Sequence, residues 1–284
     1  MLVDELLAYL FDGQPHLLAE SMAAWLASSR RFTAFIATFR DKVRKKLRTI
    51  QDQETLQDLR LELETAYLLL QEQSLSLVYE PKCGQGRCPD FAVDFTTSLT
   101  FMVEVTRQRS GQTKNIFQAT GPPVMDHAIS PSGEALIDTI CSKLGQFVPQ
   151  RSNVLVVGLD ALQLSQQDLR SVMLRIQQLA ERADPTFWGR YRFQDRTDFF
   201  RHYQRLSEIL IRESQPGETA VAWKNPQAKY PLPGRVRTSL GQKSDRIQGD
   251  QDPDSQRLVG GKCDPYGCQD RSQDPGQLCA SLRE

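Results

Sequence analysis

Two acidic residues occur in apolar stretches where a charged side chain is unexpected. Asp90 lies near the start of a Phe- and Val-containing run at residues 88–95, and Glu104 interrupts a second run at residues 101–107. Both runs predict β-strands, and the polar residues 96–98 between them predict a hairpin. An unpaired buried carboxylate is costly, and it usually persists because it is paired, protonated or bound to a metal. Two carboxylates on paired strands can hold Mg²⁺ between them, so we expect a divalent-cation site at Asp90 and Glu104.

The strand that carries Glu104 also carries a neighbouring hydroxyl. Side chains alternate between the two faces of a strand, so Glu104 and Thr106 should point to one face while Val103 and Val105 pack on the other. The same alternation sends Arg107 to the face opposite Glu104. Thr106 is therefore expected on the same face of the strand as Glu104.

A helix predicted from residue 54 to about residue 73 precedes these strands. Leucines at steps of three and four give it one buried stripe. Glu62 and Glu64 flank that stripe on opposite sides, and Glu62 lies one turn before the small residue Ala66, where the helix can approach a sheet closely. Either acid can lean toward the edge of the sheet, although a surface position is the simpler explanation of each one alone.

A second helix, predicted over residues 133–148, follows the strand pair. Thr139, Lys143 and Gln146 share one flank of this helix. The next stretch, residues 153–159, is apolar throughout, which is typical of a strand covered on both faces of a mixed or parallel sheet. A helix between two such strands implies a right-handed crossover.

The rest of the chain predicts helices, a further strand pair and a polar tail. Residues 1–50 and 165–182 have helical periodicity, and 206–211 and 219–223 have strand character. We expect the aromatic residues at 187–203 to close a core. From about residue 240 the composition turns polar, with too few large apolar residues to order itself, and this tail is predicted to be disordered.

Charge is balanced overall but not locally. The 284 residues contain 35 Lys and Arg and 35 Asp and Glu, so net charge implies neither a nucleic-acid nor a membrane partner. Residues 30–48, however, carry eight cations against the single acid Asp41. This basic run is open to two interpretations, contact with a phosphate backbone or an ordinary solvated helix face.

The cellular location is expected to be cytoplasmic. No apolar run approaches the roughly 18 residues that a membrane span needs. Six cysteines are scattered through a chain too long to be a small disulfide-stabilised protein, and reduced thiols are usual in the cytosol. We therefore expect no membrane partner.

The order of helix, strand, strand pair, helix and strand, with acids on the first helix and on the strand pair, resembles the PD-(D/E)XK nuclease superfamily. The resemblance rests on Pro89-Asp90, followed fourteen residues later by Glu104-Val105-Thr106. Glu62 on the preceding helix and Lys143-x-x-Gln146 on the following helix complete it. It covers roughly residues 54 to 160, and its motif is short and degenerate.

The resemblance implies Mg²⁺- or Mn²⁺-dependent hydrolysis of phosphodiester bonds, usually in DNA. It makes Asp90 and Glu104 the metal ligands, and it gives Glu62, with Glu64 as its rival, the role of holding a second ion or orienting the attacking water. Thr106 occupies the position where family members normally have a lysine. Lysine relocation to the neighbouring helix occurs in this superfamily, which makes Lys143 the best substitute. Gln146 would contact phosphate or water beside it, and Lys82 is a weaker substitute.

The expected architecture is therefore an α/β (α+β) fold of restriction-endonuclease-like type, in which helices flank a central mixed β-sheet. Residues 1–52 would form an N-terminal helical extension, 53–240 the nuclease-like domain and 241–284 a disordered tail. The expected function is a metal-dependent nuclease. A homodimer would suit cleavage of both strands of a duplex.

Two alternatives remain open at this point. One is a catalytically degenerate nuclease-fold protein that binds nucleic acid or a protein partner without cutting. The other is a different fold in which Asp90 and Glu104 are salt-bridged structural acids.

Overall fold

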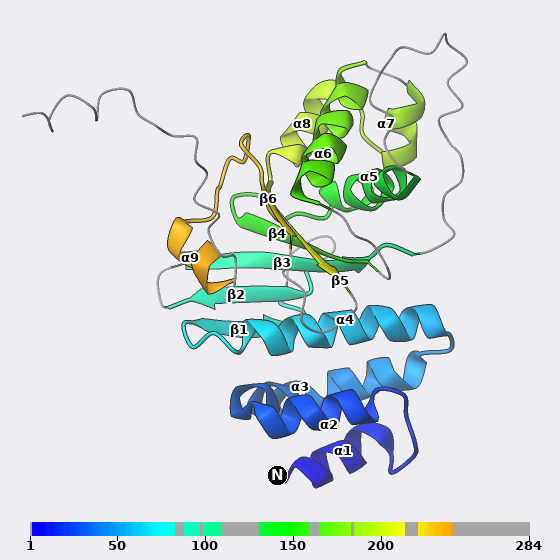
Figure 1. Cartoon of the computed structure of the whole chain (residues 1–284), viewed down its shortest axis with the longest axis vertical. Helices are drawn as coiled ribbons and strands as arrows, with labels where there is room; N and C mark the ends of the chain where they lie inside the picture. The colour runs from blue at the N-terminus through cyan, green and yellow to red at the C-terminus, as the bar shows by residue number, and fades with distance from the viewer. Residues whose placement is uncertain are drawn as a thin grey trace, which may run out of the picture. The chain divides into compact units, whose positions relative to one another are not determined.

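The computed structural model describes residues 2–82, 88–96, 99–109, 131–159, 165–182, 185–213 and 221–240 (Figure 1). All of them belong to one compact unit, Met1–Lys243. The predicted disordered tail lies outside the described residues.

Four helices form the N-terminal part of the chain. They are α1 (Val3–Phe11), α2 (Ala19–Ser28), α3 (Arg30–Thr49) and α4 (Gln53–Leu69). Ser29 caps α3 by accepting a hydrogen bond from the backbone N–H of Phe32, and Asp52 caps α4 by accepting one from Thr55. Such side-chain caps satisfy backbone donors that the first turn of a helix leaves without partners. The two caps therefore fix where the helices that border the site begin.

A six-stranded mixed sheet follows, with the strands side by side in chain order. The strands are β1 (Leu75–Tyr79), β2 (Phe91–Phe95), β3 (Leu99–Arg107), β4 (Ser152–Leu159), β5 (Leu206–Glu213) and β6 (Val221–Lys224). Strands β1, β2 and β3 pair antiparallel, β4 is parallel to both β3 and β5, and β6 is antiparallel to β5. Every residue of β4 is buried, as its continuous apolar sequence predicts.

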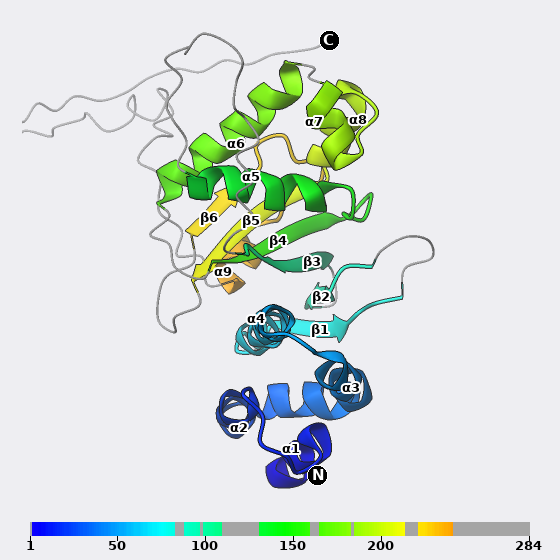
Figure 2. The ribbon, with the colours of Figure 1, turned by 90° about the vertical axis from the view of Figure 1, so that its right-hand side faces the viewer.

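Helices cover both faces of this sheet (Figures 1 and 2). On one side lies α4, with α1, α2 and α3 stacked beyond it and sharing a core with β1, β2 and β3. On the other side α5 (Pro131–Leu144), α6 (Gln166–Glu181), α7 (Pro185–Tyr191) and α8 (Arg196–Tyr203) enclose a second core. A short helix, α9 (Gly234–Ser239), follows the last strand. The N-terminal helices are thus packed onto the sheet through α4 and through α3, whose Phe35 contacts Tyr79 of β1 and Phe91 of β2.

A glycine in β4 sets how closely α4 approaches the sheet. A Cβ added at Gly158 would lie 2.5 Å from Cδ2 of Leu61, which is closer than carbon atoms tolerate. The missing side chain therefore provides the space that Leu61 occupies. This close packing places the α4 residues that follow Leu61 against the strands.

The predicted mixed sheet with flanking helices is confirmed. The aromatic stretch is also confirmed as core, since Phe187, Phe193, Phe199 and Tyr203 are all buried. The predicted helical character of the first fifty residues is confirmed, as three helices. One boundary was wrong, because α5 ends at Leu144, where the backbone N–H of Gln146 donates to the carbonyl of Lys143 at 2.9 Å.

Among the described residues no helix combines the length and the apolar character needed to cross a membrane.

Candidate functional site

The site begins where the β2–β3 ladder ends. Phe91 pairs with Val103, so the register places Asp90 opposite Glu104, just before the first residue of β2. There the Asp90 carboxylate accepts a hydrogen bond from the backbone N–H of Val105 at 2.7 Å. The side chain thus replaces the partner that a longer β2 would provide, and it holds Asp90 beside the strand that carries Glu104.

Glu104 meets a lysine from the opposite layer. Its side chain is 7% exposed, and its Oε1 lies 2.7 Å from Nζ of Lys143 on α5. Lys143 was the residue expected to replace the missing strand lysine. The structure therefore brings together a buried acid of β3 and an ammonium supplied by the following helix.

A polar pocket of about 310 Å³ opens beside this pair. Strand β3 contributes Val105, Thr106 and Arg107 to its lining, and α4 contributes Asp58 and Glu62. The remaining lining residues come from α5 and from the segment after β3: Arg109, Asp138, Thr139, Ser142 and Lys143. The pocket thus lies at the end of β3, where α4 and α5 approach from opposite faces of the sheet.

The other expected site residues are not all at this pocket. Thr106 lines it, as expected from its shared face with Glu104. Gln146 is half-buried but lies beyond the end of α5 and is not a lining residue. Lys82 is exposed and is not a lining residue either. Arg107 pairs with Asp58 and Glu54 of α4, which confirms that it points away from the α5 side, where Glu104 meets Lys143.

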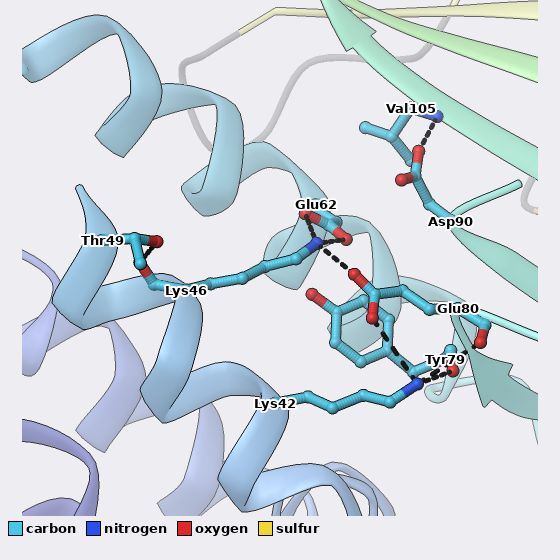
Figure 3. Close-up of polar contacts among 8 residues, drawn as sticks. All are labelled: Lys42, Lys46, Thr49, Glu62, Tyr79, Glu80, Asp90 and Val105. Carbon is cyan, nitrogen blue, oxygen red and sulfur yellow. Dashed lines mark hydrogen bonds and ion pairs between the residues drawn. The ribbon is translucent and has the colours of Figure 1, made fainter. Parts of the chain in front are cut away.

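Glu62 is held by a lysine of the N-terminal layer (Figure 3). Nζ of Lys46 on α3 lies 2.8 Å and 3.0 Å from the two carboxylate oxygens of Glu62 and 2.9 Å from Oε1 of Glu80. Lys42, one turn earlier on the same helix, lies 3.5 Å from Oε2 of Glu80. Glu62 is thereby fixed between α3 and the pocket.

The rival acid Glu64 lies in a different environment. Its pKa is raised by burial, and its nearest charges are those of Arg60 and Arg212. It is not a lining residue of the pocket, whereas Glu62 is. Of these two rivals, the geometry therefore selects Glu62 as the acid that faces the site.

Burial and repulsion between carboxylates raise the pKa values of Asp90 and Glu62. Burial raises the pKa of Asp90 to about 6, and the negative charge of Glu104 adds to this effect. Burial likewise raises the pKa of Glu62 to about 7, with a contribution from Asp90, against the opposing charge of Lys46. Like charges close together disfavour ionisation. The carboxylate of Asp90 is thus close enough to interact with both Glu104 and Glu62.

The basic run of α3 is largely occupied by contacts within the chain. Arg44 and Arg48 pair with Asp12, and Lys42 and Lys46 pair with the acids described above. Arg31 donates hydrogen bonds to backbone carbonyls, including that of Leu70 at 2.9 Å. Most of these cations therefore act within the fold, which favours a structural role for the run over phosphate contact.

The donor set suits one hydrated Mg²⁺ or Mn²⁺. Hard cations take oxygen ligands, and Mg²⁺ commonly binds through one or two carboxylates while keeping several waters. Asp90 and Glu104 are two such carboxylates, and their repulsion would be relieved by a cation. Within the described ranges no group of three or more His, Cys, Asp or Glu side chains is arranged as a metal site. Asp90 and Glu104 are the two residues that would hold such an ion.

Two residues of this constellation were not predicted. Glu80 follows β1 directly and lies opposite Asp90, whose carbonyl oxygen accepts from the Glu80 N–H at 2.8 Å. An acid at the end of a predicted strand was a usable signal for it. Lys46 had no such signal, because it is one of eight cations in the basic run and its partners are distant in sequence.

Comparison of the chain with protein-family models, with curated proteins and with solved structures found no match.

Proposed function

We propose that the chain is a divalent-metal-dependent nuclease of the PD-(D/E)XK type that hydrolyses phosphodiester bonds in DNA. The observation that carries the proposal is the contact of Lys143 with Glu104 at 2.7 Å, beside the pocket that Thr106 also lines. An ammonium is thus present at the acid whose own strand lacks the usual lysine. Its source is the helix from which we expected it.

The arrangement of elements supports the same proposal. The elements follow the order α4, β1, β2, β3, α5, β4. Neighbouring strands from β1 to β3 are antiparallel, and β4 is parallel to β3, which is the arrangement expected of a restriction-endonuclease-like fold. Fold alone says little about chemistry, so the weight rests on the side chains. Glu62 and Lys143 line the pocket, while Asp90 and Glu104 contact its lining residues Val105 and Lys143.

Each residue has a role that its chemistry allows. Asp90 and Glu104 would hold the cation, which when bound supplies charge to neutralise the phosphate and to acidify a water. Lys143 would stabilise negative charge that develops on the phosphate. Glu62 lines the pocket and would accept a hydrogen bond from the attacking water, and the Thr106 hydroxyl would orient it.

A catalytically degenerate protein that binds nucleic acid or a protein partner is the second candidate. The observation that favours it is that both lysines at the site are engaged by carboxylates, Lys143 by Glu104 and Lys46 by Glu62. Such pairs also stabilise a fold without catalysis. The two candidates differ only in what happens to a bound nucleic acid.

The test is cleavage by the purified full-length chain. Supercoiled, linear and single-stranded DNA and RNA are incubated with Mg²⁺, Mn²⁺ or a chelator, using wild type, Asp90→Asn and Asp94→Asn. Asn at position 90 keeps an oxygen for the Val105 N–H but removes the charge. Asp94, on the same strand, accepts from the Thr100 hydroxyl at 2.5 Å and serves as the matched control.

The nuclease proposal expects metal-dependent cleavage that falls at least about a hundredfold in Asp90→Asn and persists in Asp94→Asn. Cleavage that survives Asp90→Asn or the chelator would overturn it. Salt-sensitive binding without cleavage would also overturn it, in favour of the binding protein.

A further inference from the structure

The ammonium of Lys46 is saturated by its surroundings. It has three N–H donors, and it meets three carboxylate oxygens, two from Glu62 at 2.8 Å and 3.0 Å and one from Glu80 at 2.9 Å. The ring of Tyr79 lies 4.8 Å from the same nitrogen, within the range of a cation–π contact. Lys46 therefore has no spare donor for a substrate phosphate while these contacts hold.

The position of this ammonium is one that a divalent cation would also suit. Glu62 from α4 and Glu80 from the end of β1 face each other across it (Figure 3). The carboxylate oxygens of Glu62 and Glu80 are of the ligand type that Mg²⁺ and Mn²⁺ prefer. The lysine and an ion would compete for the same oxygens, so both cannot bind there together.

The backbone at Glu80 helps to create this arrangement. Glu80 has a φ of 45°, the left-handed region that non-glycine residues seldom adopt. Strand alternation alone would send its side chain away from the face on which Tyr79 packs. With this positive φ, the Glu80 side chain instead reaches α3, where it pairs with Lys42 and Lys46.

Lys46 contacts Glu62 from outside the pocket. Glu62 is a lining residue, whereas Lys46 and Glu80 are not. Both Glu62 oxygens are engaged by the ammonium, which restricts the rotation of that carboxylate. The lysine therefore acts on the pocket only through Glu62.

We propose that Lys46 is a positioning residue that fills the place between Glu62 and Glu80 with an ammonium, so that the chain binds one divalent ion, at Asp90 and Glu104, and not two. This inference rests on the proposed nuclease function. It makes α3, which comes from the expected N-terminal extension, a part of the site. Without the ammonium, Glu62 and Glu80 become a second ion site.

The test counts the ions bound by the full-length chain. Mn²⁺ is titrated into wild type, Lys46→Met, Lys46→Arg and Lys42→Met, with calorimetry for stoichiometry. Wild type and Lys46→Arg should bind one ion and Lys46→Met two. Lys42→Met is the matched control and should bind one, because Lys42 pairs with Glu80 on the same helix without a contact to Glu62.

A second set of variants identifies the new ion. Adding Glu62→Gln to Lys46→Met should return the count to one. Lys46→Gln replaces Lys46→Met if thermal melting shows that the latter does not fold. A Lys46 variant that folds and still binds one ion overturns the proposal, and so does a second ion that survives Glu62→Gln.

Turnover provides a further readout of positioning. Lys46→Met should lower kcat about tenfold, the scale of losing an outer partner of a site residue, and Lys46→Arg should restore most of it. Wild type that binds no ion and cuts nothing contradicts the nuclease function, while a Glu62-dependent ion gained in Lys46→Met still supports the role of Lys46. One ion in both wild type and Lys46→Met agrees with the ion site of the nuclease proposal but contradicts the role of Lys46.

Discussion

Two lysines approach the sheet from opposite faces, and each holds a buried glutamate in a different way. Lys46 of α3 contacts three carboxylate oxygens from Glu62 and Glu80, whereas Lys143 of α5 contacts one oxygen of Glu104 among the described residues. Lys143 also lines the pocket, and Lys46 does not. The same residue type thus fixes an acid outside the pocket on one face and lines the pocket on the other.

On the Lys46 side, burial does not make the lysine neutral. Burial alone would lower the pKa of Lys46, but the charges of Glu62 and Glu80 outweigh it and raise that pKa. The pKa of Glu80 is lowered because Lys46 and Lys42 outweigh the effect of its burial. Lys46 is therefore stabilised as a cation by the fold itself, so its charge is already balanced before any ligand arrives.

The largest expected effect separates the two lysines in catalysis. Lys143→Met should reduce kcat by about 10²- to 10³-fold, because it removes a positioned charge that stabilises the transition state. Lys46→Met should cost much less, since that ammonium acts only through Glu62. Single-turnover cleavage measures both variants, with Lys224→Met, an exposed lysine on β6, as control. Equal losses at positions 46 and 143 would contradict the distinction.

The next effect concerns stability and pH on the Lys46 side. The pKa of Glu62 in the fold is about 7, above its ordinary value of 4.5, so the folded chain holds this proton more tightly than the unfolded chain. Its contribution to the free energy of unfolding is therefore present below pH 4.5 and is lost as pH rises toward 7. Glu62→Gln should remove this dependence, on the order of 2 kcal/mol.

Urea unfolding of wild type and Glu62→Gln between pH 4.5 and 8 measures that difference. Glu20→Gln, an exposed acid on α2, is the control. Parallel profiles for wild type and Glu62→Gln would show that the carboxylate of Glu62 is ionised as easily in the fold as in water.

The smallest expected effect comes from moving the lysine of the Lys143 side to position 106. Thr106→Lys in the Lys143→Met background should recover about tenfold of the lost turnover, because Thr106 lines the same pocket and a charge there would act on the same phosphate. Thr100→Lys is the matched control, since Thr100 is on the same strand and face, six residues earlier. Recovery with Thr100→Lys but not with Thr106→Lys would contradict the placement of the site.

Local patterns predicted the strands and most of the helices, but not α7, α8 or α9. Strand alternation separated Glu104 and Thr106 from Arg107, and helix periodicity placed Lys143 on a flank that faces β3. Helix ends were less predictable, because a backbone turn ends α5 at Leu144 and places Gln146 beyond it. The choice between Glu62 and Glu64 also needed the tertiary structure, since both flank the same buried stripe.

The Lys46 side could not be predicted because its contacts join distant segments. Lys46 is sixteen residues from Glu62 in the sequence, and Glu80 is farther still. The basic run was open to phosphate contact or to an ordinary solvated face, yet the acids that neutralise it lie just after α1, on α4 and after β1. Pairing of this kind depends on how the helices pack, which periodicity does not specify.

The packing of α3 against β1 has a consequence for any shortened form of the chain. Strand β1 is at the edge of the sheet, and α3 supplies donors to its backbone, Arg31 to the carbonyl of Leu75 and Lys42 to the carbonyl of Tyr79 at 3.2 Å. Exposed strand edges are templates for aggregation. A truncated chain that began at residue 51 would expose this edge and should self-associate, which a study of the isolated sheet region would have to prevent.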